Sequence, residues 1–145
     1  MLPDSASRPN APLLALRPHV QIEPVPAEMT ASVGDFLHTT LRSVLKLQNS
    51  LLLTAVADFV LDHHMPLTKA SLVDQQRQMA ELLGRNTKLR YTVLGLVTGQ
   101  FTSEEYAFYR QHRPELNRRL LELALRRVLD QTSQVVAFAA ASSAS

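Results

Sequence analysis

The chain has 145 residues, of which 46% are hydrophobic and 19% charged, with a formal net charge of +2 and no cysteine. This length suits one globular domain, and the apolar content excludes a chain that is disordered throughout. The absence of cysteine excludes disulfide frameworks, Cys-type zinc sites and thiol catalysis. The N-terminus lacks a signal-peptide pattern and no apolar stretch approaches the roughly 20 residues of a membrane span, so we expect a cytoplasmic protein with no membrane partner.

Proline dominates the N-terminal segment. Five of the eight prolines lie in the first 24 residues, and Pro26 follows directly. This density disfavours a regular helix or a central strand. We therefore expect a flexible or extended Pro-rich arm over residues 1–26, a helical bundle domain over 27–134, and a disordered tail of small residues over 135–145.

Apolar residues recur at three- and four-residue steps after residue 32, which predicts an amphipathic helix capped by Thr30 or Ser32. From Leu51 to Leu61 the sequence is apolar nearly all round, as in a helix enclosed by others. The pattern leaves two alternatives open, one helix over about 30–62 or a break at Asn49-Ser50.

A second helix is expected after Thr68 or Ser71, with Gly84 as its stop. The segment 87–98 contains Tyr, Thr and Val, which favour a strand, and a strand there remains the alternative. Because a lone strand in a helical chain has no bonding partner, we predict a short helix over 87–98.

Two further helices have clear start signals. Thr102-Ser-Glu-Glu105 forms a capping box for a helix that runs to about His112. Pro114 suits the first turn of a last helix, whose apolar residues cover more than half of its circumference. Such a helix is either central or shared with a second subunit. The sequence thus predicts an all-α fold, a compact bundle of about five helices with a Pro-rich extended arm.

Motifs for catalysis and metal binding are missing from the sequence. It contains no G-x-S-x-G, P-loop, H-E-x-x-H or G-x-G-x-x-G, so we expect a protein that is not an enzyme. His63 and His64 are adjacent, and their side chains diverge by about 100 degrees on a helix. The pair Asp35-x-x-His38 has no second copy, which a helix-bundle metal site requires. We expect no catalytic residue, no metal and no cofactor.

Basic residues concentrate in the second half of the chain. Residues 1–65 carry four Lys or Arg against six acidic residues, and residues 66–145 carry eleven against seven. Such an excess can neutralise phosphates of a nucleic acid. Nucleic-acid binding is therefore the main alternative to protein binding.

One local pattern supports that alternative. Met79-Ala-Glu-Leu-Leu-Gly84, followed by Asn86, resembles the first helix and turn of helix-turn-helix DNA-binding proteins over about 20 residues. The resemblance implies a degenerate helix-turn-helix at about 71–97. Two of its basic residues stand where that motif buries apolar side chains. The residues implied at DNA are Arg85, Lys88 and Arg90, with Arg118 and Arg119 in a second basic cluster.

Four of the eight aromatic residues lie within nine positions, at 101–109, and basic residues follow them. Three interpretations are open, namely core packing, a partner surface, or stacking of single-stranded bases. The candidate partner-binding residues are Phe101, Tyr106, Tyr109, Arg110 and Arg113.

These features favour a small non-catalytic regulatory or adaptor protein that binds another protein and also associates with itself, as a homodimer or other homo-oligomer. The apolar helices suit association, and the N-terminal arm suits folding on a partner. The alternative is a DNA-binding transcription regulator that uses the segment 71–97.

Overall fold

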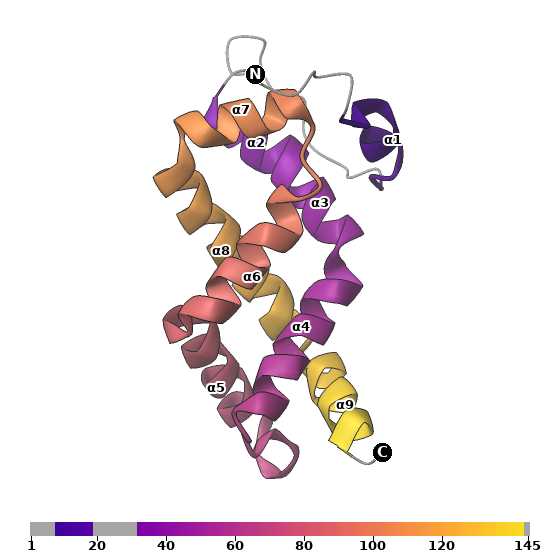
Figure 1. The fold of residues 1–145 in the computed structure, drawn as a ribbon. Helices are drawn as coiled ribbons and strands as arrows, with labels where there is room; N and C mark the ends of the chain where they lie inside the picture. The colour runs from indigo at the N-terminus through magenta and orange to yellow at the C-terminus, as the bar shows by residue number, and fades with distance from the viewer. Residues whose placement is uncertain (1–7, 19–31, 144–145) are drawn as a thin grey trace.

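The computed structural model describes residues 8–18 and 32–143, and every element in these ranges is helical. The helices form an elongated bundle, with α6 crossing the front, α8 running behind it and α7 lying across one end (Figure 1). In chain order the elements are α1 (Asn10–Ala15), α2 (Val33–Phe36), the π-helix η3 (Leu37–Leu41), α3 (Arg42–Leu47), α4 (Asn49–Asp62), the 3-10 turn η4 (Leu67–Lys69), α5 (Leu72–Arg85), α6 (Thr87–Thr98), α7 (Ser103–Gln111), α8 (Arg113–Asp130) and α9 (Thr132–Ser143).

The structure has more helices than the five or so expected, partly because the first predicted helix is broken. Residues 33–47 and 49–62 are bent by 67° at Gln48, one residue before the expected break. Ahead of the bend, η3 interrupts the α-helix where the Thr39 hydroxyl donates to the Asp35 carbonyl and the Ser43 hydroxyl donates to the Thr39 carbonyl. Such back-bonds bend helices.

No single helix in the described part of the chain has the length and apolarity to cross a bilayer. The bent pair Val33–Leu47 and Asn49–Asp62 reaches that length and composition only when its two members are taken together. Much of its apolar surface faces the core, because Leu41, Val44, Leu45, Leu52 and Leu53 are buried. A core helix of this kind is apolar because other helices enclose it.

Side-chain caps define the starts of the middle helices, as the sequence predicted. The Ser71 hydroxyl caps α5 by accepting from the backbone N–H of Asp74. The Asn86 side chain caps α6 by accepting from the backbone N–H of Leu89 at 2.9 Å. Thr102 and Glu105 form a complete capping box on α7. Segment 87–98 is therefore a helix, and the strand alternative is wrong.

The core accounts for the apolar surplus of the sequence. In α4 the buried side chains share the inward face, while Leu51 is 48% exposed. In α8 the fully buried residues recur at four-residue steps, and its other leucines are partly buried against the same core. The apolar side chains of α4 and α8 that suggested a second subunit are thus largely covered within one chain. The buried residues of α8 are Leu116, Leu120, Ala124 and Val128.

Both chain ends differ from expectation. The arm contains α1, because Pro12 lies in the first turn, where its missing N–H breaks no helical hydrogen bond. The predicted disordered tail is helical through residue 143, because α9 packs along α4 and buries Val135 and Ala139 (Figure 1). The rest of the predicted arm, residues 1–7 and 19–26, and the tail residues 144–145 lie outside the described ranges.

Candidate functional site

A groove of about 720 Å³ lies between the C-terminal end of α6 and the outer face of α7. Side chains three and four positions apart line each helix, so one face of α6 meets one face of α7. The α6 wall consists of Gly95, Thr98 and Gly99; the α7 wall consists of Ser103, Tyr106, Ala107 and Arg110; and Arg8, Phe101 and Thr102 close the groove. We call it the α6–α7 groove.

Two glycines give this groove its depth. A Cβ atom on Gly95 would meet nothing within 4 Å, so the space above this residue is open. A Cβ atom on Gly99 would lie 2.9 Å from the carbonyl oxygen of Gly95, too close for an undistorted contact. Gly99 is therefore required by the turn after α6, whereas Gly95 leaves room that an incoming side chain can fill.

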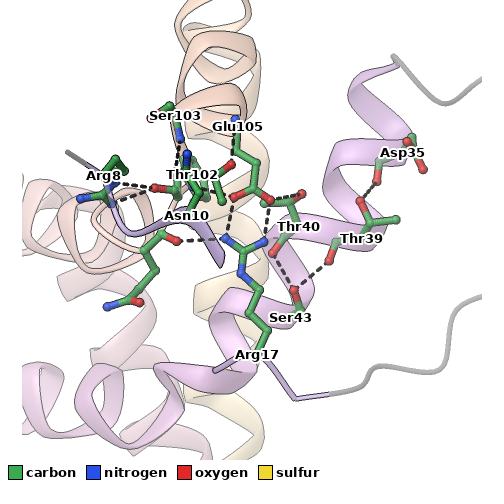
Figure 2. A network of polar contacts seen from close by, with 12 residues as sticks. Arg8, Asn10, Arg17, Asp35, Thr39, Thr40, Ser43, Thr102, Ser103 and Glu105 are labelled. Carbon is green, nitrogen blue, oxygen red and sulfur yellow. Dashed lines mark hydrogen bonds and ion pairs between the residues drawn. The ribbon is translucent and has the colours of Figure 1, made fainter. Parts of the chain in front are cut away.

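Residues 8–18, here called the strap, are fastened across the α6–α7 turn. The Arg17 guanidinium donates to both carboxylate oxygens of Glu105 at 2.5 Å and to the carbonyl of Gln100 at 2.9 Å. Glu105 also accepts from the Thr40 hydroxyl at 3.1 Å, so its carboxylate joins the strap, α7 and η3 (Figure 2). The Arg17 and Glu105 side chains are only 9% and 16% exposed, so this ion pair is largely shielded from water.

The strap also satisfies main-chain groups at the turn. Arg8 donates to the carbonyl of Gly99 at 2.8 Å and to that of Phe101 at 2.7 and 3.1 Å. Asn10 accepts from the backbone N–H of Ser103 at 3.0 Å (Figure 2). The Gly99 carbonyl and the Ser103 N–H are polar groups that helix ends leave without helical partners. The segment that the sequence presents as a free arm thus forms one end of the groove.

Glu105 is ionised at neutral pH. Burial opposes the charged form, but the hydrogen bond from Arg17, the Thr102 backbone N–H and the positive charge of Arg17 outweigh it. Together they hold the pKa of the Glu105 carboxyl below its ordinary value. The ion pair is therefore fully formed under physiological conditions.

The structure gathers the five candidate partner-binding residues around α7 but exposes only some of them. Tyr106 is 41% exposed, and it lines the groove with the exposed Arg110. Phe101 and Tyr109 are 1% and 5% exposed and pack edge to face in the core below. Arg113 is exposed, and its guanidinium lies 5.5 Å above the Tyr109 ring. Phe108, the fourth aromatic residue of the cluster, stacks on Phe36 and packs against the core, so core packing explains three of the four.

The Tyr109 side chain links two helices. Its hydroxyl donates to the side chain of Asn117 at 2.5 Å, which links α7 to α8. Burial raises the pKa of the Tyr109 hydroxyl, although the charge of Arg113 and the bond to Asn117 act in the opposite direction. This side chain is a neutral structural contact under the groove.

The residues implied at DNA differ in orientation, pairing and burial. Lys88 and Arg90 are two positions apart on α6, so they point to different sides of that helix. Arg118 is paired with Glu122 at 3.0 Å. Arg119 is half-buried, and its Nε is a buried donor that has no hydrogen-bond partner among the described residues. Arg85, the last residue of α5, is exposed.

The α5–α6 connection also differs from the helix-turn-helix motif, whose turn spans three or four residues. Here α5 continues through Gly84 to Arg85, so Gly84 is not the stop that the sequence predicted. Asn86 alone separates the two helices, serving as the C-cap of α5 and the N-cap of α6. DNA binding through this segment stays a prediction.

Neither the contacts of the strap nor the two glycines of the α6–α7 groove, Gly95 and Gly99, were predicted from the sequence. Arg8 and Arg17 stand in a proline-rich segment with no pattern that indicates where they bind. The spacing Gly95-x-x-x-Gly99 places two glycines on one helix face, and this pattern could have predicted a face without side chains. Their joint effect depends on α7, however, whose position only the structure shows.

The chain matches no protein-family model, no curated protein and no solved structure. In residues 8–18 and 32–143, no three His, Asp or Glu side chains are grouped to hold a metal ion. One of the possible ligands, His63, has hydrogen-bond contacts at both ring nitrogens, with the Phe59 carbonyl at 2.8 Å and the Asn86 side chain at 3.1 Å.

Proposed function

We propose that the protein is a non-catalytic regulatory or adaptor protein that binds a segment of another protein in the α6–α7 groove. The observation that carries this proposal is the groove itself. Its volume is about 720 Å³, its α6 wall contains two glycines, and the exposed side chains of Tyr106 and Arg110 line its α7 wall. Ligand sites commonly measure about 300–1,000 Å³. Tyrosine and arginine are also enriched among residues that dominate binding energy at interfaces.

The lining indicates what the bound segment contains. Within residues 8–18 and 32–143, the lining includes Arg8 and Arg110 but no carboxylate, so the groove favours an acidic occupant. The open space above Gly95 accepts an apolar side chain. A second hollow of about 350 Å³, lined by Ala107, Arg110 and Gln111, extends the site along α7. An elongated acidic peptide with an apolar anchor fits these features.

A matched pair of glycine variants tests this proposal. Gly95→Leu fills the groove, and Gly84→Leu adds the same side chain at an exposed position of α5 where a Cβ also meets nothing within 4 Å. Both changes keep the fold, because replacing glycine within a helix is neutral or gains about 0.5–1 kcal/mol. Peptides are first selected on the wild-type protein from a random library, and their Kd values are then measured by fluorescence anisotropy.

We expect the selected peptides to contain Asp or Glu beside an apolar residue. Gly95→Leu should weaken their binding at least tenfold, a loss of about 1.4 kcal/mol, and Gly84→Leu should leave it unchanged. Equal binding by both variants overturns the proposal.

Sedimentation tests whether the occupant is a second copy of the chain. If the wild-type protein is a dimer and Gly95→Leu is a monomer, self-association replaces foreign-protein binding as the use of this groove. If both are monomers, the self-association expected from the sequence is wrong. Selection of peptides at the groove together with a monomeric wild-type protein supports the adaptor proposal as stated.

A further inference from the structure

A second groove lies between α3 and α8, away from the site proposed above. Its volume is about 480 Å³. Leu45 and Leu123 provide apolar lining, and the remaining residues are polar or charged. The charged residues are Arg42 and Lys46 of α3 and Arg126, Arg127 and Asp130 of α8. We call it the α3–α8 groove.

Helical spacing gathers these cations from two distant parts of the chain. Arg42 and Lys46 are four positions apart, so they share one face of α3. Arg126 and Arg127 come from α8, about 80 positions later, and face the same hollow. Like charges placed this way repel each other, at a cost of about 0.2–0.5 kcal/mol for an exposed pair on a helix. The protein therefore maintains an unfavourable concentration of positive charge here.

No acidic side chain among the described residues forms an ion pair with these cations. Asp130 is the one carboxylate that the described residues place in the lining of the groove. Arg127 donates to the neutral side chain of Asn49 at 3.2 Å. Burial and the charge of Arg42 both lower the pKa of the Arg127 guanidinium. In the described part of the chain the ion pairs are Arg17–Glu105, Arg77–Asp74 and Arg118–Glu122, all outside this groove.

The helix dipole accounts for the positions of two of the four cations. Lys46 and Arg127 stand in the last turns of α3 and α8, where the helix dipole favours positive charge. Arg42, by contrast, lies inside the continuous helical segment 33–47, and Arg126 precedes the last turn of α8. Helix stabilisation does not account for these two residues, but a negatively charged ligand does.

We propose that the α3–α8 groove binds a small phosphate-bearing molecule, with Arg42, Lys46 and Arg127 contacting the phosphate and Leu123 contacting its less polar part. Guanidinium groups match phosphate oxygens in paired hydrogen bonds, and lysine adds a mobile point charge. The volume suits one small ligand. A nucleic acid would need a longer continuous track of cations, whereas this groove is a local hollow between two helices.

The test compares sodium pyrophosphate with sodium chloride at equal ionic strength, using the full chain. Isothermal calorimetry gives the Kd for pyrophosphate, and thermal unfolding gives the Tm. At a pyrophosphate concentration of about one hundred times Kd, the Tm of the wild-type protein should rise by about 5–10 °C. A Tm rise equal to that in sodium chloride overturns the proposal.

Charge-matched variants locate the site. Arg42→Gln/Lys46→Gln removes two exposed cations of the groove, and Arg85→Gln/Lys88→Gln removes two exposed cations at the α5–α6 connection. The groove variant should bind pyrophosphate at least tenfold more weakly, and the control variant should bind like wild type. Equal losses in both variants would mean a nonspecific effect of net charge and overturn the proposal.

A fluorescent single-stranded oligonucleotide distinguishes a small ligand from a nucleic acid. If the oligonucleotide binds through the groove residues while pyrophosphate does not, the groove is a nucleic-acid surface and the small-ligand proposal is wrong. Binding of pyrophosphate with competition by inorganic phosphate supports it. Failure of this proposal leaves the α6–α7 groove unaffected, because the two sites share no lining residue.

Discussion

The strap and the α3–α8 groove differ in the partners of their arginines. In the strap, Arg17 meets the Glu105 carboxylate and Arg8 meets two main-chain carbonyls. At the α3–α8 groove, Arg42 and Arg126 have no ion pair within the described residues. Arginines with internal acceptors hold the fold together, whereas those without them remain available to a ligand. The partners of an arginine, more than its presence, therefore indicate its use.

The largest effect should come from removing the paired arginine. Arg17→Met leaves the Glu105 carboxylate largely shielded from water without its cation, which should lower the free energy of unfolding by about 2–3 kcal/mol. Urea denaturation at pH 7 measures the change. The control Arg77→Met breaks an exposed pair with Asp74 and should cost less than about 0.5 kcal/mol. Similar losses in both variants would remove the distinction between the strap and ordinary surface pairs.

A smaller effect should come from the glycine that shapes the groove. Gly99→Ala forces a Cβ against the Gly95 carbonyl at 2.9 Å, and it should lower stability by about 1–2 kcal/mol. Gly84→Ala, in open space, should instead raise stability by about 0.5–1 kcal/mol. Thermal unfolding of the two variants measures the difference. A stable Gly99→Ala variant would show that the turn after α6 relaxes freely.

Lowering the pH should reduce the free energy of unfolding by a fraction of the loss expected for Arg17→Met, because it protonates Glu105. The pKa of Glu105 is lower in the folded than in the unfolded chain, so its contribution to stability is fully present above about pH 4.3, the ordinary pKa of glutamate. The contribution is lost as the pH falls through the lower pKa of the folded state. Urea denaturation between pH 6 and pH 3 should therefore show a smaller loss of stability for Glu105→Gln than for wild type. Parallel curves would contradict this role of Glu105.

The smallest effect should have the opposite sign. Arg42→Gln relieves repulsion with Lys46 and Arg127, and it should raise the free energy of unfolding by about 0.3 kcal/mol in a buffer without phosphate. Because salt screens exposed charges, the gain should shrink in about 0.5 M sodium chloride. The control Arg85→Gln should leave the free energy of unfolding unchanged, both in the phosphate-free buffer and in sodium chloride. A loss of stability on replacing Arg42 would mean that this residue has an internal role, as Arg17 does.

Local signals in the sequence predicted the helices better than their arrangement. Ser71, Asn86 and Thr102 cap helices as expected, because capping depends on neighbouring backbone groups. The π-helix was not predicted, and the bend at Gln48 lies one residue before the break at Asn49-Ser50 that the sequence left open as an alternative. The helix in the proline-rich arm was missed because Pro12 is harmful only beyond the first turn.

The candidate sites were less predictable, because each joins residues from distant segments. Tyr106 and Arg110 were identified from the aromatic cluster, and they line the α6–α7 groove. Phe101 and Tyr109 belong to the same cluster but are buried, a difference that helical periodicity alone does not decide. The α3–α8 groove unites cations about 80 positions apart, and no local pattern connects them.

The strap makes contacts that span 83 to 93 positions of the chain. Such contacts form only after a long loop has closed, and its entropic cost slows them relative to contacts between neighbouring helices. We therefore expect the helices between α2 and α7 to assemble first and the strap to dock last. Its release would then be an early step of unfolding, so the lifetime of the protein against proteolysis depends on how long Arg17 stays attached.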